Sequence, residues 1–163
     1  MKRIIASIVL LSISGLVFGQ NSSIESFFDK YKDRRDITHV SLSGSIFKLA
    51  SAVAEWGDEE DEELMAFADI ADGIDHMEIL NIDDYRDFFD NDEIEDLVDD
   101  MKKEGYEVLM TIREDRQLIR ILSKQSKRSV LNDVTIIDRD GRDFSVITID
   151  GSVRLSDINR VID

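Results

Sequence analysis

Four segments in the C-terminal half of the chain alternate between apolar and polar residues, and short turns join the first to the second and the third to the fourth. They cover residues 106–112, 118–123, 132–138 and 144–150. Alternation with a period of two is typical of strands that bury one face. The turn of the second pair contains Asp140-Gly141, and Asp-Gly between apolar strands is the strongest short-range signal for a β-hairpin. The chain is therefore restricted to folds that contain an antiparallel sheet.

Helices and strands alternate in the preceding half of the chain. Apolar spacing predicts strands over 37–43 and 74–82 and helices over 24–34, 46–54, 64–70 and 94–103. Helix caps are expected at Ser22, which forms a capping box with Glu25, and at Asp83, Asn91 and Ser156. This order predicts a single α+β domain, in which a mostly antiparallel sheet has its helices packed on one face.

The N-terminus has the layout of a secretory signal peptide. Lys2 and Arg3 precede an apolar run over residues 4–18, which is too short for a spanning helix of about 20 residues. We therefore expect residues 1–20 to be removed, leaving one domain over residues 21–163 that is exported to the periplasm, the cell envelope or the medium. The chain has no cysteine, so lipidation at an N-terminal Cys is not expected.

Acidic residues are concentrated in one segment. The chain has 36 acidic and 20 basic residues and a formal charge of −16. Residues 56–100 hold 20 of the acids and one base, Arg86, whereas the rest of the chain after the leader is close to neutral. This acidity argues against a nucleic-acid binder or a polybasic membrane-binding surface. Three interpretations remain: a solvated face, complementarity with the basic segment 102–128 of the same or a neighbouring chain, and divalent cation binding.

Two groups of these acids are candidates for binding. Clustered carboxylates suit Ca²⁺, and the candidate ligands are Asp58, Glu59, Glu60, Asp61, Glu62 and Glu63. The candidate interaction face lies on the next acidic helix and consists of Asp92, Glu93, Asp96, Asp99 and Asp100. Residues 138–143 resemble part of a calcium loop, but the Gly at their fourth position fits a hairpin turn instead.

No motif in the chain indicates a particular reaction. The sequence lacks the Gly-x-Ser-x-Gly elbow, the Gly-rich dinucleotide fingerprint, the Walker loop and any thiol nucleophile. His39 and His76 lie in different predicted strands, and two histidines without a third ligand are poor evidence for zinc. A pair of carboxylates for hydrolysis remains an alternative, although nothing in the sequence selects the pair.

Five segments share the apolar spacing of a known protein family. They are Phe28-Asp29-Lys30-Tyr31, Ile46-Phe47-Lys48-Leu49 and residues 106–112, 144–151 and 155–158. On these segments the chain resembles the domain of unknown function 4252 family, small envelope proteins found in Bacteroidetes. The resemblance implies secretion and an α+β domain, and it supplies no catalytic residue because the family has no assigned activity. Some family members carry a lipidated Cys, which this chain lacks.

These patterns together predict a non-catalytic envelope module that binds another protein or a second copy of itself. The acidic helical face is the expected contact surface. The alternatives are a carboxylate-dependent hydrolase of envelope material and a calcium-binding module, and Ca²⁺ is the one cofactor considered.

Overall fold

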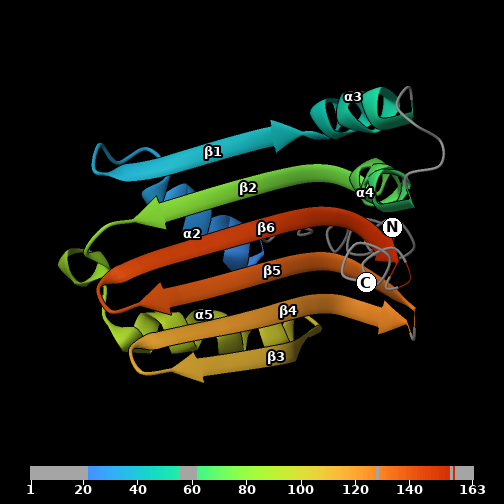
Figure 1. Cartoon of the computed structure of the whole chain (residues 1–163). Helices are drawn as coiled ribbons and strands as arrows, with labels where there is room; N and C mark the ends of the chain where they lie inside the picture. The colour runs from blue at the N-terminus through green and yellow to red at the C-terminus, as the bar shows by residue number, and fades with distance from the viewer. Residues whose placement is uncertain (1–21, 56–61, 128, 155, 157–163) are drawn as a thin grey trace, which may run out of the picture.

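The computed structural model describes residues 22–55, 62–127, 129–154 and 156. Its helices are α2 (Ser23–Tyr31), α3 (Gly44–Glu55), α4 (Glu62–Asp72), the 3₁₀ helix η1 (Tyr85–Asp87) and α5 (Asn91–Lys103). Its strands are β1 (Ile37–Ser43), β2 (Ile74–Ile82), β3 (Tyr106–Glu114), β4 (Gln117–Lys127), β5 (Val130–Asp140) and β6 (Asp143–Arg154). Figure 1 shows these elements along the chain.

The described strands form one antiparallel sheet in the order β1-β2-β6-β5-β4-β3. Strands β3 to β6 make a meander, so both predicted hairpins are confirmed. In the second hairpin, Gly141 adopts a φ of 62° between β5 and β6, as a tight turn requires. β2 pairs with β6 across the centre of the sheet, where Ile79 lies opposite Ile147. This pairing joins the two halves of the chain.

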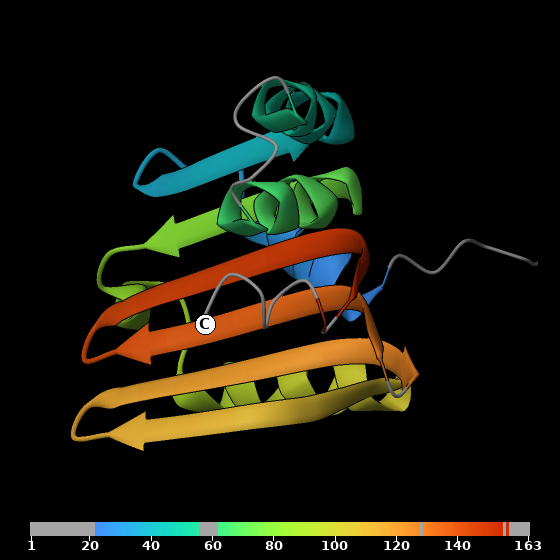
Figure 2. The ribbon, with the colours of Figure 1, turned by 45° about the vertical axis from the view of Figure 1, so that its right-hand side comes forward.

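α2 and α5 cover one face of the sheet, and the main core lies between these layers (Figures 1 and 2). A cluster of aromatic rings fills its centre. The Phe144 ring centroid lies 5.2 Å from that of Phe89, 5.8 Å from Phe27 and 5.9 Å from Tyr85. Edge-to-face and tilted arrangements of this kind are favourable beyond the area they bury.

α3 and α4 lie together at the ends of β1 and β2, away from the aromatic core (Figures 1 and 2). The described residues of the core cluster come from α2, α5, η1 and the strands and the segments beside them. The predicted α+β class is therefore confirmed. α2 and α5 form the expected layer of helices on one face of the sheet, and α3 and α4 lie outside this layer.

The residues predicted to begin α2 form the expected cap. The Ser22 hydroxyl accepts a hydrogen bond from the backbone N–H of Glu25 at 3.3 Å, and the Ser22 N–H donates to the Glu25 carboxylate at 3.0 Å. This confirms the capping box, which satisfies two free donors at the helix start. The helix ends at Tyr31, slightly earlier than the sequence predicted.

Two other caps were predicted at the wrong residue. Asp90, rather than Asn91, caps α5, because its extended backbone lets its carboxylate accept from the N–H groups of Asp92 and Glu93. Asp83 caps no helix, because the chain first turns through a left-handed residue, Asp84, with a φ of 56°. Only the three residues of η1 follow that turn.

β3 departs from the regular alternation predicted for it. Its register shifts between Val108 and Met110, which leaves Leu109 as an extra residue. Val108 lies opposite the buried Leu122, whereas Met110 lies opposite Ile121 on the other face. A bulge switches the faces of the residues that follow it, so Met110 is 51% exposed.

Three predictions fall outside the described residues. They are the signal peptide over residues 1–20, the acids at 58–61 and the final helix beyond Ser156. Within the described part of the chain, no helix combines the length and apolar character needed to cross a bilayer.

Candidate functional site

α5 carries the predicted interaction face and buries its opposite side. The residues it buries are Ile94, Leu97, Val98 and Met101, which recur at helical spacing. Its first turn is acidic and its last turn is basic, and both charges are favourable at those helix ends. The acidic side chains are therefore left on the surfaces that face α2, the sheet edge and solvent.

An open groove of about 640 Å³ lies between α2 and α5. The carboxylates that line it are Glu93, Asp96, Asp100 and Glu104. Its apolar lining consists of Phe27 from α2 and Leu97 from α5. The groove thus contains three of the five predicted interaction-face residues, whereas Asp92 and Asp99 are not part of its lining.

Glu104 ties the two walls of this groove together. Its Oε1 atom accepts hydrogen bonds from the Ser23 backbone N–H at 2.8 Å and from the Ser23 hydroxyl at 2.5 Å. Its Oε2 atom is buried and has no hydrogen-bond partner among the described residues. An unsatisfied buried acceptor is costly, and an acceptor that is part of a carboxylate favours a cationic donor.

Glu93 is held by α2. Its Oε1 atom accepts from Lys30 Nζ at 2.5 Å and from the Tyr31 hydroxyl at 2.8 Å. The hydrogen bond to Glu93 raises the pKa of Lys30, and desolvation by burial raises the pKa of Tyr31. Lys30 offsets only one of the carboxylates of the groove.

The other predicted face residues are paired unequally. Asp99 and Asp100 form ion pairs with Lys102 at 2.9 Å and Lys103 at 2.6 Å, each three residues along the same exposed helix. Exposed pairs of this kind contribute well under 1 kcal/mol. Asp96 forms no ion pair within the described residues, which makes it the least compensated acid of the groove.

α5 also meets the basic part of the sheet. Arg120 of β4 donates to Glu95 at 2.8 Å, and the Arg120 side chain is only 14% exposed. Internal complementarity between the acidic helix and the basic hairpin therefore occurs at this contact. It uses an acid that the sequence did not single out.

A second cavity, of about 420 Å³, lies between the start of α2 and the sheet. The carboxylates that line it are Glu25, Glu78, Asp133 and Asp150, beside His76 and Lys124. Burial raises the pKa of Tyr106, which also lines it, to about 12. This cleft gives the hydrolase alternative a location, and the hydrolase function itself stays a prediction.

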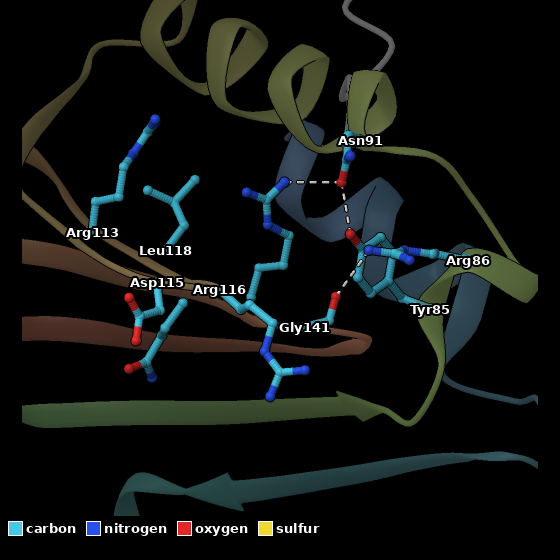
Figure 3. A pocket seen from close by; sticks show the side chains of 10 residues that line it. Tyr85, Arg86, Asn91, Arg113, Asp115, Arg116, Leu118 and Gly141 are labelled. Carbon is cyan, nitrogen blue, oxygen red and sulfur yellow. Dashed lines mark hydrogen bonds between the residues drawn. The ribbon is translucent and has the colours of Figure 1, made fainter.

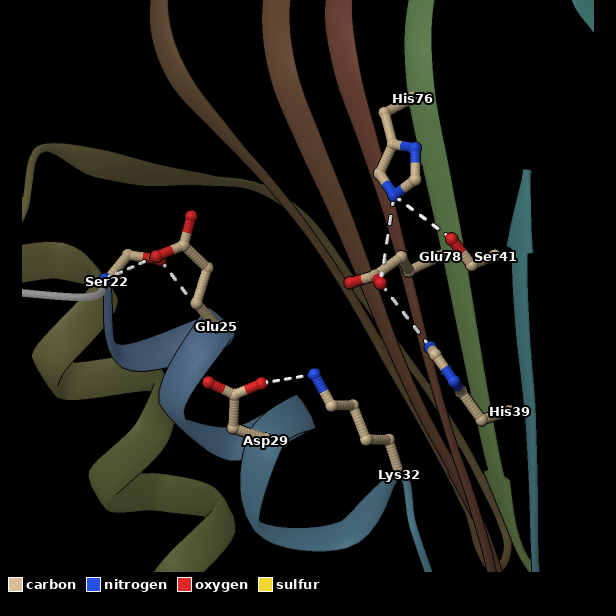
Figure 4. A network of polar contacts seen from close by, with 8 residues as sticks. All are labelled: Ser22, Glu25, Asp29, Lys32, His39, Ser41, His76 and Glu78. Atoms are coloured by element: carbon tan, nitrogen blue, oxygen red, sulfur yellow. Dashed lines mark hydrogen bonds and ion pairs between the residues drawn. The ribbon is translucent and has the colours of Figure 1, made fainter. Parts of the chain in front are cut away.

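The two histidines flank one carboxylate of this cleft (Figure 4). Glu78 lies 3.4 Å from His39 Nε2 and 3.7 Å from His76 Nε2, and Ser41 lies 3.4 Å from the same atom of His76. The sequence placed these histidines on separate strands, and the pairing of β1 with β2 brings them together. Within the described residues, no three histidine or carboxylate side chains are arranged so that they could hold one metal ion.

Asp150 is the carboxylate of this cleft whose pKa is raised. Desolvation in the cleft, followed by the nearby charge of Asp133, raises the pKa of Asp150 above its ordinary value of 3.8, although the residue stays partly exposed. The charged form therefore destabilises the fold above the raised pKa, and this cost vanishes at a pH below 3.8, where both states are protonated.

We expect Asp150→Asn to raise the melting temperature at pH 7 and to leave it unchanged near pH 3. The amide keeps the shape of the side chain without its charge. Thermal denaturation of both proteins across this pH range measures the effect. A wild-type advantage at pH 7 would contradict the assigned cause of the pKa shift.

The predicted calcium ligands are not assembled into a described site. Residues 58–61 lie outside the described part of the chain, and Glu62 and Glu63 begin α4. The sequence also missed Phe27, Leu97 and Glu104 among the groove residues: Phe27 and Leu97 have the spacing of ordinary core residues, and Glu104 follows the basic end of α5. No pattern in the sequence distinguishes these three from structural residues.

Comparison with known protein families finds a match. The model of the family described as Domain of unknown function (DUF4252) matches residues 31–161. Neither a curated protein nor a solved structure matches the chain. The family match covers most of the chain, including the six described strands and α3 to α5. The protein therefore belongs to the DUF4252 family.

Proposed function

We propose that this protein is an exported, non-catalytic interaction module of the cell envelope that holds a cationic segment of a partner protein in the groove between α2 and α5. The leader-like sequence over residues 1–20 supports export. The absence of a catalytic motif from the sequence favours binding over chemistry.

The observation that carries the proposal is the acidic groove, in which, within the described part of the chain, Asp96 is unpaired and one oxygen of Glu104 lacks a hydrogen bond. Oε2 of Glu104 has no partner among the described residues, and Asp96 forms no ion pair there. Lysine or arginine side chains of a partner would pair with the exposed Asp96 and would offset the charge of the Glu104 carboxylate behind it. Charge-assisted hydrogen bonds are roughly twice as strong as neutral ones.

The apolar lining defines the partner further. Phe27 and Leu97 provide contacts for apolar side chains between the carboxylates. A segment with lysines or arginines beside leucine-like residues therefore fits the groove, as an amphipathic helix or an extended strand. Such a partner is attracted by the carboxylates that the acidic segment 56–100 and Glu104 contribute to the groove.

We expect a labelled amphipathic peptide of leucine and lysine to bind the protein at low ionic strength. Asp96→Lys places a positive charge in the groove and is expected to weaken binding about tenfold, or about 1.4 kcal/mol. Added salt should weaken binding further, because the exposed carboxylates are screened. Fluorescence anisotropy measures both effects.

Asp36→Lys is the matched control, since Asp36 lies exposed in the turn before β1 and makes the same change in net charge. Equal weakening by the two variants would show that the peptide responds to net charge alone. Peptide binding that is indifferent to Asp96→Lys would overturn the assignment of the groove.

A further inference from the structure

A cavity of about 270 Å³ opens at the end of the sheet where the β3–β4 and β5–β6 turns meet η1. The arginines that line it are Arg86, Arg113, Arg116 and Arg139. They come from η1, from the β3–β4 hairpin and from β5, so the topology brings together residues from three parts of the chain. Figure 3 shows Arg113 beside Leu118 and Arg86 beside Tyr85.

These four positive charges lie together in a protein whose overall charge is strongly negative. The chain carries a formal charge of −16, yet the described lining of this cavity contains one carboxylate, Asp115. None of the four arginines forms an ion pair with a described residue. By contrast, Arg120 and Arg142 pair with Glu95 and Asp84.

Two of the guanidinium groups are held by neutral oxygens. Arg86 donates to the backbone carbonyl of Gly141 at 3.2 Å, and Arg139 donates to the Asn91 side-chain oxygen at 2.9 Å. The Tyr85 hydroxyl donates to the same Asn91 oxygen at 2.6 Å. These contacts orient the groups while leaving their charge uncompensated, which is the arrangement that an anion site requires.

The register of the sheet sets the spacing between Arg113 and Arg139. Arg113 lies opposite Leu118 across β3 and β4, and Leu118 lies opposite Arg139 across β4 and β5. The buried Leu118 therefore separates two arginines on the same face, within reach of one ligand. A planar guanidinium binds two oxygens of a phosphate at once.

We propose that this cavity binds a compact phosphate-bearing anion with two or more negative charges. The volume accommodates a diphosphate or a phosphorylated headgroup rather than a large ligand. A soluble phosphate compound and a phospholipid headgroup present the same chemistry, and the open position at the hairpin turns gives access to both. This site is separate from the α2–α5 groove and does not depend on it.

Calorimetric titration of the full chain with pyrophosphate at low ionic strength tests the site. We expect binding that the double variant Arg113→Gln/Arg116→Gln weakens by about a hundredfold, or about tenfold for each arginine. Both side chains are exposed, so the melting temperature should be unchanged. The control Arg35→Gln/Lys48→Gln removes two exposed charges elsewhere and should bind as the wild type does.

Vesicles of phosphatidylcholine containing phosphatidic acid distinguish the two sources. Cosedimentation that is lost in the double variant identifies a headgroup ligand, and pyrophosphate binding without cosedimentation identifies a soluble one. No heat with pyrophosphate, or equal heat with the wild type and the double variant, would overturn the proposal.

Discussion

Phe144→Ala is expected to lower the free energy of unfolding by about 3–5 kcal/mol. Phe144 is 1% exposed and contacts the rings of Phe27, Tyr85 and Phe89. Removing it leaves a cavity that three aromatic side chains cannot fill without leaving their rotamers. Urea denaturation measures the loss, which corresponds to a fall in melting temperature of about 10–20 °C.

The same substitution should loosen the α2–α5 groove, because Phe27 lines the groove and rests on Phe144. Ile147→Ala on the same strand is the control. Ile147 is only partly buried on the opposite face of the sheet, so its loss is expected to cost about 1–2 kcal/mol. Equal losses in the two variants would show that the aromatic cluster is not the main core.

Gly151→Ala is expected to destabilise the protein by about 3 kcal/mol or more. Gly151 has a φ of 131°, a conformation that residues with a Cβ rarely adopt. A Cβ there would also overlap the carbonyl oxygen of Gly73, which accepts a hydrogen bond from Ser152 at 2.9 Å. Both effects act where β2 meets β6.

Gly105→Ala separates these two causes. Gly105 has a φ of 94°, but a Cβ there meets no atom within 4 Å. Its substitution is expected to cost about 1 kcal/mol from conformation alone. Circular dichroism during thermal denaturation compares the variants, and equal melting temperatures would contradict the steric account of Gly151.

The elements that the sequence predicted correctly are those that depend on neighbouring residues. Asp140-Gly141 defines its hairpin, and Ser22 with Glu25 defines the start of α2. The bulge at Leu109 was missed because β3 has apolar residues before, at and after this position. Its pattern therefore fits the pairing with β4 whether or not one residue is extra. The insertion of β2 beside β6 was also missed, since the hydrophobic pattern of a strand does not specify which strand lies next to it.

The candidate sites show the same difference between features set by neighbouring residues and features set by the assembled fold. Helical spacing placed Glu93, Asp96 and Asp100 on one helix, and the structure brings them to one groove. The opposite wall comes from α2, whose docking on α5 depends on the whole core. The arginine-lined cavity was not predicted at all, because its residues converge only after the hairpins and η1 are assembled.

The place of β6 in the sheet determines when the chain is able to finish folding. β6 is the last described strand, yet it lies inside the sheet between β2 and β5. As the chain emerges from the ribosome, β1 and β2 appear first, and β2 keeps an open edge until β6 follows. Open edges invite pairing with other chains. A chain stalled before residue 143 therefore leaves this edge open to chaperones or to its own copies.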